Sequence, residues 1–274
     1  MEKYKFVFIG GLHRSGTTLL EKAIESHSEI AGHVKGVAPY MEGQLFQSIY
    51  PTDQQLGGVG RFAFNAESHL TEKSHLITDK NRKTLFKEWS TYWDLKKPIL
   101  LEKSPPNGIK SRFLQELFPN SHFIFVIRHP FAVSLATQKW SKTSLLSLIE
   151  HWITYNEIMM KDLQYIKNRT IIRYEDFVST PNKTLKEIAE LLQIKNEFKL
   201  PETISPTIND KYFSQIEALK KSANLTNRRI FKAIKYLRKN NFPLFIKYDK
   251  EINDIELRFE KRIQEFGYSF IKKS

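Results

Sequence analysis

The sequence predicts an α/β protein, a single domain in which helices cover both faces of a central parallel β-sheet. Four short runs of β-branched and aromatic residues recur along the chain, and helical patterns separate them. Parallel strands need a long connection between them, usually a helix, so this alternation favours a parallel sheet. The 274 residues are enough to give one such domain a full hydrophobic core.

The positions of apolar residues, glycines and prolines give the predicted elements. A helix is expected to begin at Pro181, because Ser179 and Thr180 supply hydroxyl N-cap groups before it. Residues 51–67 contain one proline and three glycines, which indicates a loop. The predicted strands are residues 4–9, 98–101, 122–127 and 170–174. The other predicted helices are residues 17–27, 109–117, 131–139 and 145–166.

The chain divides into a predicted core and a basic extension. Residues 1–195 contain every predicted strand and are expected to form the α/β core. Residues 196–274 form the predicted C-terminal extension, which is helical and basic from about Ser214 onward. Trp140 and Trp152 fall in helical patterns of the core, and we expect both to be buried.

The composition excludes several classes of chemistry. The chain has no cysteine, so it forms no disulfide, holds no thiolate-bound zinc and uses no catalytic thiol. No spacing of histidines and acids predicts a metal site. The apolar run at residues 6–12 is too short and too rich in glycine for a signal peptide, and no run of about 18 apolar residues exists. A cytoplasmic protein without a membrane span is the resulting expectation.

The net charge points to an anionic partner. A formal charge of +13 is typical of proteins that meet nucleic acids, anionic lipids, polyanionic glycans or phosphorylated cofactors. No recognisable nucleic-acid-binding module accompanies the charge. A non-catalytic protein that binds polyanions is therefore one hypothesis that the composition leaves open.

A glycine-bounded turn between the first strand and the first helix is the strongest local signal. Such a turn aims backbone N–H groups and a helix N-terminus at one point, which favours phosphate binding. Gly11 and Gly16 have the spacing of the P-loop pattern G-x-x-x-x-G-K-[ST], but Thr17 stands where that pattern has lysine. The cation lies inside the loop instead, at Arg14.

The stretch 13–18, His-Arg-Ser-Gly-Thr-Thr, resembles the 5′-phosphosulfate loop of sulfotransferases that use 3′-phosphoadenosine 5′-phosphosulfate (PAPS). The resemblance covers roughly residues 6–195 and is closer to the glycan, tyrosylprotein and bacterial branch than to the cytosolic small-molecule branch. It implies a fold like that of the P-loop NTPases and sulfuryl transfer from PAPS, without a metal, to a hydroxyl or amine. The implied loop contacts are Gly11, His13, Arg14, Ser15, Gly16, Thr17 and Thr18.

Two downstream motifs extend the resemblance. Arg128-His129-Pro130 is similar to the family's R-x-P signature, in which the arginine binds the 3′-phosphate. The family places a serine eight residues after this arginine, where this chain has an alanine, so Ser134 or Thr137 is expected to substitute. Tyr174 matches the tyrosine that lies near the adenine. Basic residues that could complete the 3′-phosphate site are Lys220, Lys221, Arg228 and Arg229.

The expected catalytic residues are Arg14, Glu42 and Lys103. Arg14 would stabilise the negative charge that develops on the departing phosphate oxygen. Glu42 follows Arg14 by 28 residues, about the distance at which heparan sulfate sulfotransferases carry their glutamate base. Lys103 lies in a Glu-Lys-Ser-Pro stretch that resembles the glycan sulfotransferases, and it would add positive charge beside the sulfuryl oxygens. The competing bases are His33 and His75.

The sequence is compatible with more than one acceptor and with more than one class of enzyme. The Gly-rich loop at residues 57–64 is a candidate for the border of the acceptor site, and a plain connecting loop is the alternative. The basic charge favours a saccharide or another anionic acceptor. A P-loop nucleotide kinase or NTPase is the main alternative. It is disfavoured because Thr17 replaces the lysine and because the strand that would carry a magnesium-binding aspartate ends in Arg128.

Overall fold

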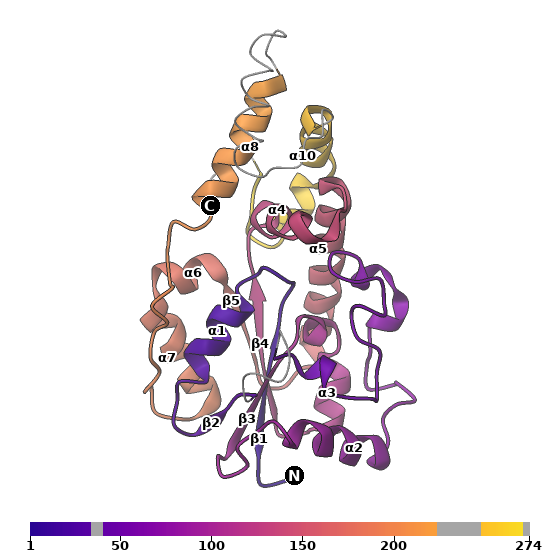
Figure 1. Ribbon diagram of the computed structural model, residues 1–274, viewed down its shortest axis with the longest axis vertical. Coiled ribbons are helices and arrows are strands. Elements are labelled where there is room, and N and C mark those ends of the chain that lie inside the picture. Colours follow the sequence, from indigo (N-terminus) through magenta and orange to yellow (C-terminus); the bar gives the residue numbers. More distant parts are fainter. Residues whose placement is uncertain (34–40, 224–247, 271–274) are drawn as a thin grey trace.

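A five-stranded parallel sheet lies at the centre of the computed structural model, which describes residues 1–33, 41–223 and 248–270 (Figure 1). The strand order is β2-β3-β1-β4-β5, and every neighbouring pair is parallel. The predicted α/β fold with a parallel sheet is therefore confirmed. The strands are β1 (Lys5–Gly10), β2 (Ile30–Ala31), β3 (Ile99–Lys103), β4 (Ser121–Ile127) and β5 (Arg169–Arg173).

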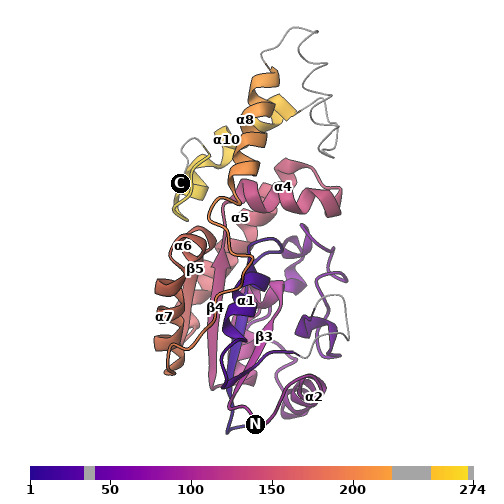
Figure 2. The same ribbon diagram turned by 60° about the vertical axis from the view of Figure 1, so that its left-hand side comes forward.

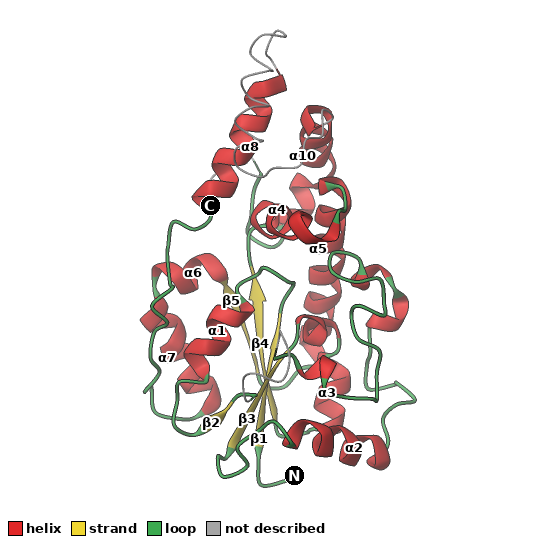
Figure 3. Ribbon diagram, in the orientation of Figure 1, coloured by secondary structure: helices red, strands yellow, loops and turns green. Residues whose placement is uncertain are grey.

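Helices cover both faces of the sheet (Figure 3). One face carries α1 (Thr17–Ile24), α6 (Tyr174–Ser179) and α7 (Pro181–Leu192). The other carries α2 (Asp79–Ser90), α3 (Ser111–Leu117) and α5 (Leu145–Asp162). Helix α4 (Pro130–Ser141) follows β4 at the carboxyl end of the sheet.

Successive residues of β1 build the two halves of the core. Phe6 and Phe8 face the aromatic-rich side with α2 and α3, whereas Val7 and Ile9 face the aliphatic side with α1 and α7. Side chains alternate between the faces of a strand, so a strand that is covered on both faces becomes a continuous apolar run. Burial on both sides fixes the register of β1, and with it the position of the loop that follows.

Most predicted elements are present, with ends shifted by a few residues. Helix α7 begins at Pro181 as predicted, but the hydroxyl of Thr180 donates to the carbonyl oxygen of Asp176 and does not cap the helix. The predictions missed β2, which has two residues, and α2, in which Leu85 and Trp89 alone are buried. Two buried side chains in twelve residues give too weak a period to detect.

The described helices of the predicted C-terminal extension lie beyond the carboxyl end of the sheet (Figure 2). These helices are α8 (Asp210–Ala223) and α10 (Tyr248–Gln264), which pack against each other. Helix α10 also packs on α5, where Arg262 and Glu157 form an ion pair of 2.7 Å. Arg228 and Arg229 lie outside the described residues. No helix in the described part of the chain has the length and apolar character needed to cross a bilayer.

The packing of α7 on the sheet gives a stability prediction. We expect Ile188→Ala to lower the free energy of unfolding by about 2–4 kcal/mol, because the fully buried side chain would leave a cavity in the aliphatic half of the core. Glu187→Ala on the exposed side of the same helix is the control and should change it by less than about 0.5 kcal/mol. Urea denaturation measures both, and equal effects would contradict this packing.

Candidate active site

The loop between β1 and α1 has the backbone of an anion site. Arg14 and Gly16 adopt left-handed conformations, with φ of 68° and 98°, and turn the chain sharply into the helix. Gly16 is the N-cap residue and has no side chain to accept from the N–H groups of the first turn. That turn contains no acidic residue either. The positive end of the α1 dipole therefore faces the loop, and no acidic side chain in the first turn of the helix neutralises it.

Tyr174 packs directly against this loop. A Cβ atom at Gly16 would lie 2.2 Å from Cδ2 of Tyr174, so only glycine allows the ring to approach this closely. Tyr174 is the first residue of α6, immediately after β5, and is itself buried. The end of β5 thus lies beside the loop between β1 and α1, although the two are far apart in sequence.

Arg128 joins these two elements. It follows the last residue of β4, and its Nη1 donates to the carbonyl oxygen of Arg14 at 2.9 Å. Its guanidinium carbon lies 4.2 Å from the centre of the Tyr174 ring, within range of a cation–π interaction. The loop, Arg128 and Tyr174, which were each singled out from sequence, are therefore in direct contact.

Trp140 was predicted to be buried, and this was wrong. The side chain lies in the last turn of α4, is 45% exposed and stacks on Arg14, whose guanidinium carbon is 3.2 Å from the ring centre. Trp152, the other tryptophan predicted for the core, is buried and donates to the carbonyl oxygen of Arg128 at 3.0 Å. Helical periodicity is weak near the end of a helix, which explains the error at Trp140.

Glu42 and Lys103 form a buried ion pair. The Nζ of Lys103 lies 3.1 Å from Oε1 of Glu42 and 3.8 Å from Oε2 of Glu21, and the lysine side chain is 4% exposed. The other oxygen of Glu42 accepts from Nε2 of Gln44 at 2.8 Å. Burial alone would lower the pKa of Lys103, but Glu42 and Glu21 more than offset it and raise the pKa above its usual value. The ammonium group is therefore held charged between the two acids.

Glu102 is a site residue that the sequence predictions missed. It is fully buried at the end of β3 and accepts from the N–H of Gly43 at 2.8 Å and from Oγ of Ser104 at 2.5 Å. Burial raises its pKa to about 7. Its bond to Gly43 fixes the chain directly after Glu42. An acid that directly follows a buried apolar run was the signal available in the sequence.

A pocket of about 560 Å³ opens beside the loop. Glu42 lines it together with His13 and Asp53, whose Nε2 and Oδ2 atoms lie 3.0 Å apart. The volume is in the range of small-molecule sites. The candidate loop at residues 57–64 lines this pocket, and Trp140 does as well. The remaining lining residues are Gln44, Leu45, Gln54, Gly57, Gly58, Val59, Arg61 and Ser141.

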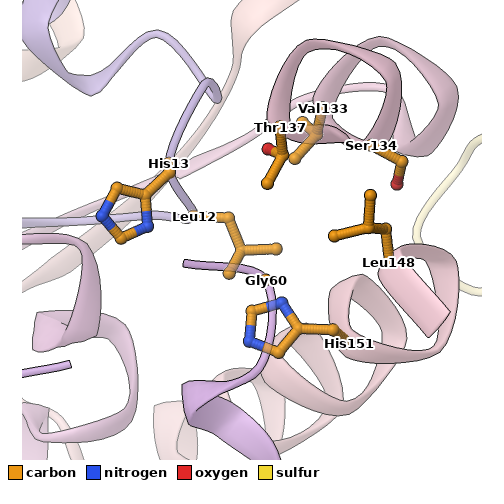
Figure 4. A pocket seen from close by; sticks show the side chains of 8 residues that line it. All are labelled: Leu12, His13, Gly60, Val133, Ser134, Thr137, Leu148 and His151. Atoms are coloured by element: carbon orange, nitrogen blue, oxygen red, sulfur yellow. The ribbon is translucent and has the colours of Figure 1, made fainter. Parts of the chain in front are cut away.

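Ser134 and Thr137 lie around a separate, much smaller cavity of about 10 Å³ (Figure 4). Their hydroxyls are buried and make no hydrogen bond to any described residue. His13 and His151 line the same cavity, whereas Arg128 does not. The predicted role of these hydroxyls at the 3′-phosphate stays a prediction. A void of this size has room for about one water molecule.

The competing histidines lie elsewhere. His33 is stacked on Trp93 with ring centres 5.2 Å apart, and burial lowers its pKa to about 4. His75 is exposed, and neither histidine lines the pocket beside the loop. Over the described ranges, no three His, Asp or Glu side chains are grouped in a way that could hold a metal ion.

A glycine loop between strand and helix, with an arginine at the end of the neighbouring strand, defines an α/β protein of the P-loop type. The chain belongs to the sulfotransferase family, whose family model, described as "Sulfotransferase family", matches residues 7–197. The resemblance seen in the sequence is therefore confirmed. Members of this family are enzymes that take a sulfuryl group from PAPS.

Individual relatives are distant. The chain is 26% identical over 204 residues to protein-tyrosine sulfotransferase A of Caenorhabditis elegans. The aligned region covers 69% of this chain and 50% of that protein. It thus spans about half the length of this curated relative. The sulfotransferase domain of the Synechococcus PCC 7002 olefin synthase shares its fold, with 17% identity, a TM-score of 0.51 and coverage of 98% of this chain and 97% of that one. The sulfotransferase domain of the curacin biosynthetic pathway is 19% identical, with a TM-score of 0.43 and coverage of 70% and 75%.

The acid beside Lys103 gives a pH prediction. Burial, more than any other cause, raises the pKa of Glu21 to about 8. That is above the value of about 4.3 in an unfolded chain, so the folded state holds the proton more tightly. Stability is then lost as pH rises from about 5 to about 8. The glutamine in Glu21→Gln cannot titrate. This variant should therefore reduce the fall of the free energy of unfolding with pH by up to about 1 kcal/mol per pH unit.

Urea unfolding across this pH range measures the effect. Glu67→Gln, at an exposed position, is the control and should keep the wild-type slope. A slope that stays unchanged in Glu21→Gln would contradict the raised pKa.

Proposed function

We propose that this chain is a PAPS-dependent sulfotransferase that transfers a sulfuryl group to a hydroxyl or amine. The observation that carries the proposal is the hydrogen bond of 2.9 Å from Arg128 to the carbonyl oxygen of Arg14. It brings an arginine suited to one phosphate next to a helix N-terminus suited to another. PAPS carries phosphate at both its 3′ and 5′ positions, so a ligand with two separated phosphates matches this pair of sites.

The residues around the loop fit such a ligand. The 5′ side would rest on the backbone of the loop, with Gly11, His13, Ser15, Gly16, Thr17 and Thr18 as its proposed contacts. Arg128 would hold the 3′-phosphate, with Ser134 or Thr137 as the proposed hydroxyl. The Tyr174 ring, packed on Gly16, would lie near the adenine. Bound PAPS supplies the sulfuryl group and leaves as adenosine 3′,5′-bisphosphate.

The proposed catalytic groups divide between the loop and the pocket. Arg14, whose guanidinium stacks on the Trp140 ring, would stabilise the negative charge that develops on the leaving oxygen. Glu42 lines the pocket and would accept the proton from the acceptor hydroxyl or amine. Lys103 contacts Glu42 at 3.1 Å and keeps that carboxylate in place. The positive charge of Lys103 would also attract the sulfuryl oxygens.

We propose that the acceptor presents a hydroxyl or amine, with a saccharide as one candidate, and that it enters the pocket of about 560 Å³. The division into a core at residues 1–195 and a helical extension at 196–274, and a cytoplasmic location, are further proposals. A nucleotide kinase is less well supported, because Thr17 occupies the position of the P-loop lysine.

Ligand-dependent melting tests the donor. We expect adenosine 3′,5′-bisphosphate, without metal, to raise the melting temperature by a few degrees at about 100 times its Kd. Arg128→Ala should abolish most of this shift. A shift with ATP and Mg²⁺ but none with the bisphosphate would reject the proposal and favour a kinase.

Substitution of the base tests the chemistry. Glu42→Gln removes the proton acceptor and should lower turnover by about 100-fold or more, while the bisphosphate still binds. Transfer of ³⁵S-sulfate from labelled PAPS to a panel of hydroxyl and amine acceptors measures turnover. Glu67→Gln serves as the exposed control. Turnover close to that of the wild type would remove Glu42 from the mechanism.

A further inference from the structure

Arg128 is a buried cation whose hydrogen-bond partners within the described residues are all uncharged. Its Nε and Nη2 donate to the same oxygen, Oδ1 of Asn209, at 2.9 and 2.6 Å, and its Nη1 donates to the carbonyl oxygen of Arg14. Within the described ranges, no carboxylate lies close enough to form an ion pair with Arg128. Burial is also the main reason that its pKa is lowered.

A desolvated guanidinium without an ion pair is costly for a folded chain. The cost is offset when an anion from outside binds, and a planar guanidinium offers more N–H groups than these two oxygens use. The surroundings of Arg128 therefore leave its positive charge available to an anionic ligand. The neutral amide of Asn209 fixes the guanidinium without cancelling its charge.

Asn209 is itself held in one orientation. Its Nδ2 donates to Oε1 of Glu175 at 2.7 Å, and the same oxygen accepts from the N–H of His129 at 3.0 Å. The other oxygen of Glu175 accepts from the hydroxyl of Tyr268 at 2.8 Å. Asn209 therefore lies between the carboxylate of Glu175 and Arg128. The amide oxygen of Asn209 faces the guanidinium, and its amide nitrogen faces the carboxylate.

We propose that Asn209 is a positioning residue for recognition of the 3′-phosphate: it orients the Arg128 guanidinium and acts as a neutral spacer that keeps Glu175 from pairing with it. This inference rests on the proposed function, since it assumes that Arg128 binds the 3′-phosphate. Nothing in the sequence singles out Asn209, because an asparagine in a connecting segment matches no motif.

The proposal also gives the C-terminal extension a part in cofactor selection. Asn209 directly precedes α8, and the Tyr212 ring in the first turn of α8 lies 5.6 Å from the Arg128 guanidinium carbon. Tyr268, which follows α10, completes the set through Glu175. Asn209 and Tyr212 of the extension thus contact the group that would distinguish PAPS from nucleotides without a 3′-phosphate, and Tyr268 is connected to it through Glu175 and Asn209.

The test compares adenosine 3′,5′-bisphosphate with AMP, which differs by the 3′-phosphate alone. Dissociation constants for both ligands would be measured by calorimetry on the full chain, for the wild type, Asn209→Ala, Asn209→Asp and Arg128→Ala. Asn196→Ala, at an exposed position earlier in the extension, is the matched control. AMP binding by each variant shows that its loop is still folded.

We expect Asn209→Ala to weaken bisphosphate binding about tenfold and Asn209→Asp to weaken it more, because the new carboxylate neutralises Arg128. AMP binding should change by less than about twofold in both, and Asn196→Ala should match the wild type. If Arg128→Ala loses selectivity for the bisphosphate while both Asn209 variants keep it, the role of Asn209 is rejected and the proposed function stands. If Arg128→Ala keeps it too, Arg128 does not bind the 3′-phosphate, and the roles of Arg128 and Asn209 are both rejected. If the wild type itself binds AMP as tightly as the bisphosphate, the proposed function is overturned.

Discussion

The hydrogen bond from Arg128 to the carbonyl oxygen of Arg14 is the contact on which the anion site depends. It crosses 114 residues of sequence, and it is possible because β1 and β4 are neighbours in the sheet. Parallel neighbours end at the same edge, so the segments that follow them meet there. The core that buries both faces of β1 therefore also fixes the distance between two cationic elements.

The end of β3 shows how one strand serves the two sides of a site. Glu102 and Lys103 are consecutive and must point in opposite directions. Glu102 turns to the interior and holds the backbone at Gly43, while Lys103 turns to the acids Glu42 and Glu21. The same alternation thus anchors the segment that carries Glu42 and sets the charge beside it.

Sequence reasoning identified the fold and the strand ends well, because buried parallel strands are apolar throughout and glycine turns are distinctive. It located Arg14, Arg128 and Tyr174, which the structure brings together. It missed Asn209 and the anchoring role of Glu102, since both act through contacts between distant segments that no local pattern records. The burial expected for Trp140 was wrong, because the end of a helix carries little periodic information.

The stacking of Trp140 on Arg14 also gives the protein an optical property. Of its four tryptophans, Trp89, Trp93 and Trp152 are buried, and Trp140 is the exposed one. An indole in contact with a guanidinium has an emission that depends on that contact and on the surrounding water. We therefore expect the intrinsic fluorescence of the chain to contain one component, from Trp140, that depends on the position of Arg14.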